Sequence, residues 1–142
     1  MKKVPAAFTG TRDGMTPEQE RIVRDLMRTR VSVLHNGSAR GADAQAAVMC
    51  FDLGIYVIAH PATGVRASDR VEIESDESRD PKLPLDRNRD MVDEAELVIA
   101  TPKGFVEEAR GSGTWATIRH AQKTRKPLII VWPDGTVTEE NV

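Results

Sequence analysis

Two glycine-rich turns carry the main signal for the fold: Asn36-Gly37-Ser38-Ala39-Arg40-Gly41-Ala42-Asp43 and Arg110-Gly111-Ser112-Gly113-Thr114. Each turn lies between an apolar run typical of a strand and a run with helical periodicity. A strand that ends in glycines and leads directly into a helix lets backbone N–H groups approach a bound anion closely. A third apolar run ends in Thr9-Gly10-Thr11-Arg12. The pattern therefore predicts three loops around one pocket for a phosphate-bearing small molecule.

Apolar runs of strand length alternate with helical patterns along the whole chain. The predicted strands cover residues 4–8, 31–34, 55–59, 97–100 and 128–132, and the predicted helices include residues 42–53, 85–95 and 114–125. A further helix follows a capping box made by Thr16 and Gln19, with Pro17 at its first position. This alternation predicts an α/β class: a single-domain, Rossmann-like three-layer sandwich over residues 1–142 with a mostly parallel five-stranded sheet. If the strand order is 3-2-1-4-5, ligands bind between the first and fourth strands, where the order reverses.

Two segments lack periodicity. Residues 63–84 are rich in charge and almost free of apolar side chains, which predicts a surface loop. A loop of that length is either a solvated excursion or a lid over a binding site. Residues 134–142 are polar and are expected to form a flexible tail.

Composition and charge limit the possible functions. The 142 residues include 20 Lys and Arg against 22 Asp and Glu, so the basic excess typical of nucleic-acid-binding proteins is missing. No apolar stretch approaches the ~20 residues that span a bilayer, and a cytoplasmic protein without membrane partners is expected. Cys50 is the single cysteine, which excludes an intramolecular disulfide, and its apolar neighbours predict a buried thiol. No pair of histidines has the spacing of metal ligands along the chain, so neither a metal nor a cofactor is expected.

The motifs resemble a known superfamily. Phe8-Thr9-Gly10-Thr11-Arg12-Asp13, His35-Asn36-Gly37-Ser38-Ala39-Arg40-Gly41-Ala42-Asp43, Arg87-Asn88-Arg89-Asp90-Met91 and Gly111-Ser112-Gly113-Thr114 are similar to the motifs of the stand-alone YspA-like proteins. These belong to the SLOG superfamily, with the LOG phosphoribohydrolases and the Rossmann-like domain of DprA. The resemblance implies a pocket for a nucleotide or nucleotide derivative, in a protein that is often a homo-oligomer. It assigns the phosphate-binding glycine motif to Gly111, Gly113 and Thr114, and the second glycine loop to Gly37, Arg40, Gly41 and Asp43.

Several side chains near these turns have both a binding and a structural interpretation. Arg12 and Arg40 can bind a phosphate or form salt bridges. Asp43 can hold Arg40 or a ribose hydroxyl, or it can simply interact favourably with the dipole of its helix. Neighbours two apart on a helix diverge, so Arg87 is preferred to Arg89 as the residue that faces the pocket. The predicted binding residues are Gly10, Thr11, Arg12, Gly37, Ser38, Arg40, Gly41, Asp43, Arg87, Gly111, Ser112, Gly113 and Thr114.

Three functions follow from this pattern. The first is binding of a nucleotide or nucleotide-derived molecule by a ligand-sensing module. The second is LOG-like hydrolysis of an N-glycosidic or phosphate bond. The LOG enzymes have a catalytic glutamate after their Gly-Thr, where this chain reads Thr114-Trp115-Ala116-Thr117, so Glu107, Glu108 or Asp43 would have to replace it. The third, DprA-like binding of single-stranded DNA, is disfavoured by the charge balance and by the presence of only six aromatic residues.

Overall fold

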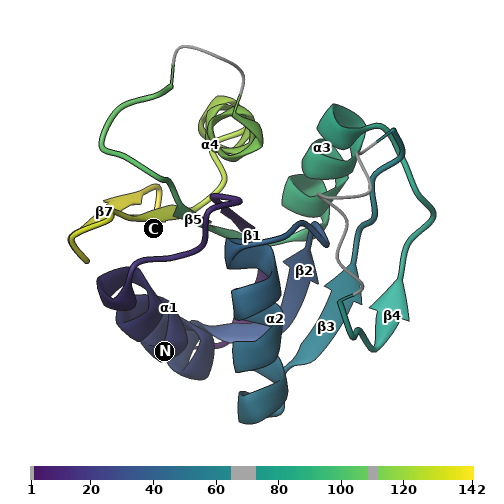
Figure 1. Ribbon diagram of the computed structural model, residues 1–142, viewed down its shortest axis with the longest axis horizontal. Helices are drawn as coiled ribbons and strands as arrows, with labels where there is room; N and C mark the ends of the chain where they lie inside the picture. The colour runs from purple at the N-terminus through teal and green to yellow at the C-terminus, as the bar shows by residue number, and fades with distance from the viewer. Residues whose placement is uncertain (1, 65–72, 109–111) are drawn as a thin grey trace.

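The computed structural model describes residues 2–64, 73–108 and 112–142. In these residues seven strands form one sheet with four helices around it (Figure 1). The elements in chain order are β1 (Val4–Gly10), α1 (Pro17–Arg30), β2 (Val31–Asn36), α2 (Ala42–Leu53), β3 (Tyr56–Ala59), β4 (Glu77–Ser78), α3 (Pro84–Glu94), β5 (Leu97–Thr101), α4 (Gly113–Lys123), β6 (Leu128–Val131) and β7 (Val137–Glu140). The predicted α/β class is confirmed.

The sheet has the order β4-β3-β2-β1-β5-β6-β7. The five central strands follow the predicted order, and all of their pairings are parallel. The strand count differs from the prediction because each edge carries one more strand. β4 lies inside the charged segment 63–84 and pairs in parallel with β3. β7 pairs antiparallel with β6 from Leu128↔Glu140 to Val131↔Val137.

The prediction of a flexible tail at residues 134–142 is therefore wrong. A tight turn reverses the chain after β6: Gly135 donates its backbone N–H to the carbonyl of Trp132, and Asp134 Oδ1 accepts from the N–H of Thr136. The indole N–H of Trp132 also donates to Thr138 Oγ1, 2.8 Å away. β7 has no apolar face of its own, and these polar interactions hold it at the edge of the sheet.

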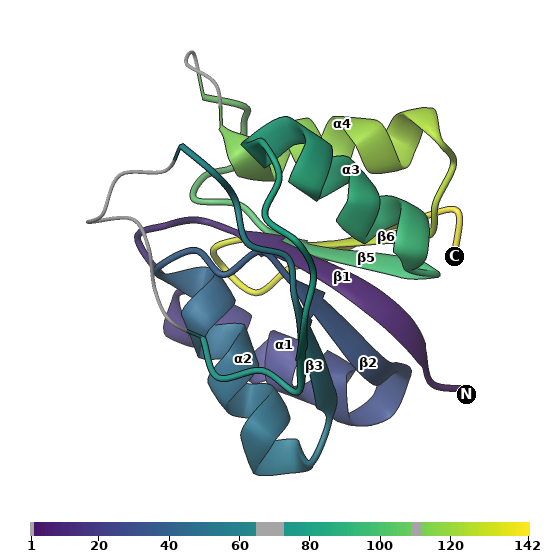
Figure 2. The same ribbon diagram turned by 90° about the vertical axis from the view of Figure 1, so that its right-hand side faces the viewer.

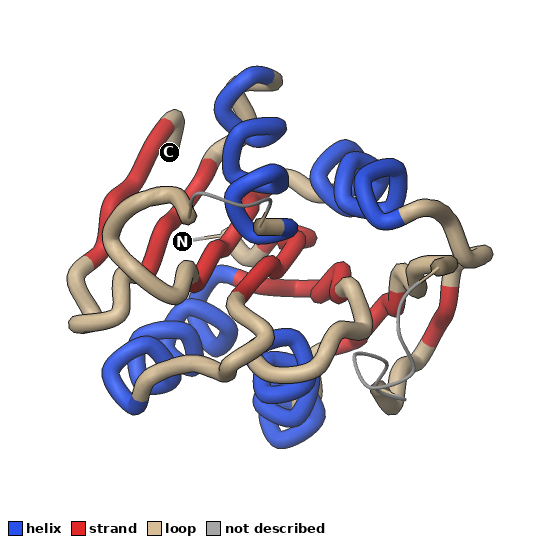
Figure 3. The backbone as a smooth tube through the Cα atoms, turned by 45° about the horizontal axis from the view of Figure 1, so that its top comes forward, coloured by secondary structure: helices blue, strands red, loops and turns tan. Residues whose placement is uncertain are grey.

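The helices form two outer layers around the sheet. Figure 1 shows α1 and α2 on one side of the sheet and α3 and α4 on the other, and Figure 3 shows the same arrangement turned by 45° about the horizontal axis. One apolar core packs α1 and α2 against the sheet around Phe8, Met27 and Cys50. The second packs α3 and α4 around Met91 and Ile118. The predicted three-layer sandwich and the buried thiol are both found. None of the helices in the described ranges combines the length and apolar character needed to cross a membrane.

A capping box fixes the start of α1, as predicted. Thr16 Oγ1 accepts from the N–H of Gln19, and Gln19 Oε1 accepts from the N–H of Thr16. The Gln19 side chain is buried, and its amide donates to the carbonyls of Pro102 and Val131 at 2.9 and 3.0 Å. One side chain thus caps the helix and also ties it to the ends of β5 and β6.

The ends of β1 and β5 meet the start of α2 at very short range. A Cβ on Gly10 would lie 2.3 Å from Thr101 Oγ1 and 2.5 Å from Ala42 Cβ. Gly41 has φ +79°, and a Cβ there would lie 2.3 Å from the carbonyl oxygen of Arg12. Both positions therefore require glycine, Gly10 for space and Gly41 for space and backbone conformation.

We predict that Gly10→Ala lowers the free energy of unfolding by about 3 kcal/mol or more, because the methyl group forces β1 away from β5 or α2. Urea unfolding followed by circular dichroism measures this. Gly104→Ala is the matched control, since a Cβ on Gly104 meets nothing within 4 Å. A Gly10→Ala variant as stable as the control would show that this junction can relax.

Candidate functional site

A cleft of about 420 Å³ opens at the carboxyl ends of β1 and β5, where the strand order reverses. The loops that surround it emerge together at one end of the molecule (Figure 2). The cleft is lined by Phe8, Thr9, Gly10, Thr11, Arg12, Asp13, Gly37, Ala39, Asp43, Arg87, Asn88, Met91, Lys103, Glu108, Ser112, Gly113 and Thr114. Its volume lies within the ~300–1,000 Å³ typical of small-molecule sites.

The loop between β2 and α2 is held by two buried polar side chains. Asn36 Nδ2 donates to the Asp43 carbonyl at 2.8 Å, and Asn36 Oδ1 accepts from the N–H of Ser38 at 2.9 Å. Asp43 Oδ2 accepts from the N–H of Ala39 at 3.2 Å. The loop is therefore shaped before any ligand binds.

The Asp43 carboxyl group is buried in the wall of the cleft. Its Oδ1 atom has no hydrogen-bond partner among the described residues. Burial raises its pKa to about 7, although the N–H of Ala39 and the charges of Arg87 and Arg12 act in the opposite direction. At neutral pH the group therefore exists as both carboxyl and carboxylate, and Oδ1 can accept from or donate to a bound molecule.

Arg87 extends from the first turn of α3 to the loop after β2. Its Nη1 donates to the carbonyl of Gly37 and, at 3.1 Å, to the carbonyl of His60. A Cβ on Gly37 would lie 3.0 Å from both Arg87 Nη1 and Asp43 Oδ2, so the guanidinium and the carboxyl group converge over this glycine. Burial lowers the pKa of Arg87, while Asp43 counteracts that effect. The position of Arg87 is thus fixed by backbone carbonyls.

The N-terminus of α4 lies open to the cleft. Ser112 is the N-cap residue, and its hydroxyl accepts from the N–H of Trp115 at 3.4 Å. Gly113 is exposed, and a Cβ there would meet only Asn88 Nδ2, at 3.8 Å. Thr114 is buried behind it. The first N–H groups of a helix lack partners within it, and its dipole favours a negative charge at this end.

The mouth of the cleft carries charges of both signs. Lys103 Nζ lies 2.9 Å from Asp13 Oδ2, and this exposed pair lowers the pKa of Asp13. Exposed pairs of this kind contribute ~0–1 kcal/mol, so they separate easily. Glu108 lines the cleft, whereas Glu107 forms an ion pair with Arg119 of α4.

Most of the predicted binding residues come together at this cleft. Gly10, Thr11, Arg12, Gly37, Asp43, Arg87, Ser112, Gly113 and Thr114 line it. Ser38, Arg40 and Gly41 do not. Ser38 instead lines a neighbouring cavity with Ala59 and Pro61. Arg40 is exposed, and its positive charge helps to lower the pKa of Asp13. Gly111 lies outside the described residues.

Some lining residues have only weak sequence signals. Met91 comes from α3, four positions after Arg87, which is the spacing of neighbours on one helix face. That spacing would have selected Met91 once Arg87 was placed, whereas Asn88, directly after Arg87 in the sequence, has no such signal. Lys103 lies in the loop after β5, where a parallel sheet positions its ligands, but its charge alone did not distinguish it from other surface lysines.

Comparison with known proteins gives structural relatives only. No protein-family model matches the chain, and no curated protein matches it by sequence. The molybdenum cofactor binding protein of Rippkaea orientalis superposes with a TM-score of 0.67 at 20% identity, over 93% of this chain and 78% of that one. DprA of Streptococcus pneumoniae superposes with a TM-score of 0.65 at 19% identity, over 90% of this chain and 50% of DprA. The molybdenum cofactor carrier protein of Chlamydomonas reinhardtii superposes with a TM-score of 0.59 at 19% identity, over 91% of this chain and 76% of that one.

These likenesses agree with the superfamily that the sequence motifs suggested, at the level of the fold. DprA was part of that resemblance, and the same arrangement of strands and helices extends over nine-tenths of this chain. The chain therefore shares the Rossmann-like α/β fold of these proteins.

Proposed function

We propose that this protein binds a nucleotide or nucleotide-derived phosphorylated molecule in the cleft between β1 and β5. The observation that carries the proposal is that two features line one cleft: the open N-terminus of α4, and the buried Oδ1 of Asp43, which has no hydrogen-bond partner among the described residues. The first attracts an anion, and the second requires a polar partner. A molecule with a phosphate at one end and hydroxyl or amino groups at the other satisfies both.

The proposal implies an orientation for the ligand. The phosphate lies against Ser112 and Gly113, and Arg87 adds a positive charge to the lining of the cleft. A sugar hydroxyl or a ring amino group lies against Asp43, where a proton is shared between ligand and carboxyl oxygen. Lys103 can turn from Asp13 to the ligand at small cost, because their ion pair is exposed.

The structural neighbours support binding of a small molecule. Two of them are described as a molybdenum cofactor binding protein and a molybdenum cofactor carrier protein, so relatives of this fold hold a ligand. DprA is a DNA processing protein, but this chain matches only half of it and lacks a basic excess. We therefore favour a sensing or carrying role for a small molecule over DNA binding.

One observation supports hydrolysis as a second candidate. A buried carboxyl group with a pKa near 7 in a cleft has the properties of a general acid or base. Against this, Ala116 stands where a LOG-type glutamate is expected, and Glu107 is engaged with Arg119. Of the three carboxyl groups named above as substitutes for that glutamate, Asp43 and Glu108 line the cleft.

Gly113→Val should abolish ligand binding, because its methyl groups would occupy the space in front of the α4 N-terminus. The fold should persist, since a Cβ at this position makes only an ordinary contact. Thermal shift with a panel of nucleoside mono-, di- and triphosphates measures the effect. Gly104→Val, in a loop position that does not line the cleft, should behave like the parent protein. Full ligand stabilisation in Gly113→Val would place the phosphate elsewhere.

Asp43→Asn should remove a loss of stability that the parent protein shows between pH 4 and 7. The folded state binds a proton at Asp43 up to pH about 7, whereas the unfolded chain releases it near 3.8. The stability contributed by this group is therefore full at low pH and decreases as the pH rises to 7, by up to about 4 kcal/mol at ~1.4 kcal/mol per pKa unit.

Urea unfolding of both proteins at several pH values from 4 to 8 checks this. Asparagine cannot ionise, so the stability difference between variant and parent should grow with pH and level off above 7. His35 and His60 titrate in both proteins, and their contributions cancel in the difference. A difference that is independent of pH would mean that Asp43 is not protonated in the folded state.

Purified protein incubated with nucleoside monophosphates should release no free base above background, although some of these molecules bind. The physical reason is that the position of the LOG-type glutamate is taken by Ala116, which cannot transfer a proton. Chromatography of the reaction measures base release. Release that disappears in Asp43→Asn or Glu108→Gln would establish the hydrolase candidate in place of the binding role.

A further inference from the structure

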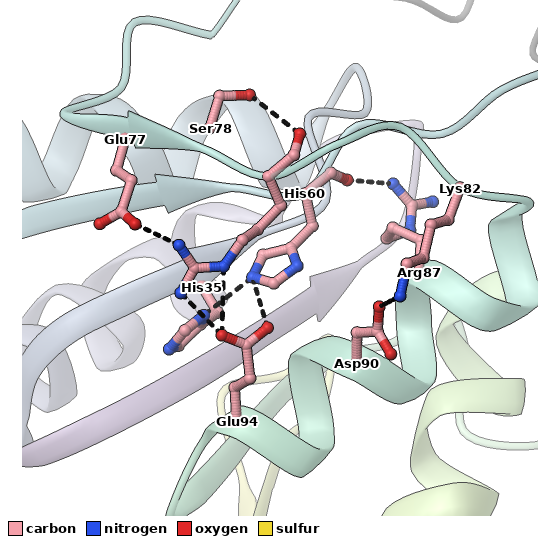
Figure 4. Close-up of polar contacts among 9 residues, drawn as sticks. His35, His60, Glu77, Ser78, Lys82, Arg87, Asp90 and Glu94 are labelled. Carbon is pink, nitrogen blue, oxygen red and sulfur yellow. Dashed lines mark hydrogen bonds and ion pairs between the residues drawn. The ribbon is translucent and has the colours of Figure 1, made fainter.

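A second group of polar side chains lies between the sheet and α3, outside the cleft. His35 comes from β2, His60 follows β3, and Glu94 ends α3. Figure 4 shows the three side chains directed toward one another. Both histidines are buried, while Glu94 is partly exposed. Neither the cleft nor its proposed ligand uses this group.

The donor atoms of these three side chains converge. His35 Nδ1 lies 2.8 Å from His60 Nε2, which in turn lies 3.8 Å from Glu94 Oε2. All three atoms fall within 4.8 Å of one another. Two ligands of a tetrahedral zinc ion, each ~2.0–2.1 Å from the metal, lie about 3.3 Å apart. The two imidazole nitrogens would need to separate by about half an ångström, and Glu94 Oε2 would need to approach His60 Nε2 by a similar amount.

Glu94 is oriented by a neighbouring cation. Arg79 Nη2 and Nε donate to Glu94 Oε1 at 2.7 and 3.2 Å, so Oε2 is the oxygen left facing His60. Arg79 also pairs with Glu77, and the two carboxylates outweigh its charge. Partners that orient a ligating carboxylate are a regular feature of metal sites. The local charge therefore favours an added cation.

We propose that His35 Nδ1, His60 Nε2 and Glu94 Oε2 form a binding site for a divalent first-row transition metal ion of the zinc class. Two imidazole nitrogens and one carboxylate oxygen suit such an ion, whereas Mg²⁺ and Ca²⁺ prefer oxygen ligands. Three donors from the described residues leave at least one coordination position for water or another ligand.

The proton balance of binding is simple. Burial lowers the pKa of both histidines, that of His60 to about 4, so both rings are neutral at pH 7. In the metal-free protein one ring donates the hydrogen atom between His35 Nδ1 and His60 Nε2. Metal binding moves that proton to the other nitrogen of the same ring, which leaves a lone pair on each coordinating nitrogen. No net proton is released.

The test is titration of chelator-treated full-length protein with Zn²⁺ by calorimetry, with Co²⁺ absorption spectra to report the ligand geometry. The parent protein should bind one Zn²⁺ per chain and should not respond to Mg²⁺. His35→Asn, His60→Gln and Glu94→Gln keep a similar shape but replace a ligand with a poor one, and each should weaken binding at least about tenfold.

His120→Gln is the matched control, because this third histidine pairs with Asp93 at the surface, 3.1 Å away, and should not affect zinc binding. Circular dichroism of the metal-free variants verifies folding. If the variants of the buried histidines unfold, Glu94→Gln provides the decisive result, because the side chain of Glu94 is partly exposed and its replacement should leave the fold intact. Absence of saturable Zn²⁺ binding in the parent, an equal response to Mg²⁺, or unchanged affinity in Glu94→Gln would overturn the proposal. The outcome is independent of nucleotide binding at the cleft.

Discussion

The whole arrangement depends on one close approach of backbone, where the end of β1 meets the end of β5 and the start of α2. The N–H of Thr11 donates to the carbonyl of Thr101, and the carbonyl of Thr11 accepts from the N–H of Ala42. Gly10 fits there only because it has no side chain. Since β1 lies at the reversal of strand order, this junction determines where the surrounding loops meet and hence where the cleft forms.

The buried carboxyl group of Asp43 works against stability in the same region. Folded proteins pair nearly all of their buried polar groups, yet Asp43 Oδ1 lacks a partner among the described residues. The group shapes its loop through Ala39 and faces Arg87 across Gly37. Stability is commonly reduced at functional sites, where side chains are selected for a ligand rather than for the fold. This agrees with the role that we propose for Asp43.

The two edge strands were not predicted from the sequence pattern. β4 and β7 consist mainly of exposed polar residues, so neither has the apolar run that marked the central strands. Their backbones pair with β3 and β6 through main-chain hydrogen bonds, which do not require an apolar side-chain pattern.

Sequence patterns were also incomplete as predictors of the residues that line the cleft. Ser38 and Arg40 lie in a motif typical of ligand binding, but neither lines the cleft, and Ser38 lines a neighbouring cavity.

The sequence by itself determined the order of central strands and helices, the cap of α1 and the end of the sheet where the cleft lies. These features follow from short windows of residues, because periodicity, capping and glycine turns are local. Only the tertiary structure decided that Arg87 faces Asp43 and that His35 meets His60, 25 positions away. Such contacts depend on the register between parallel strands and on the rotation of α3 against the sheet, which the packing of distant residues sets.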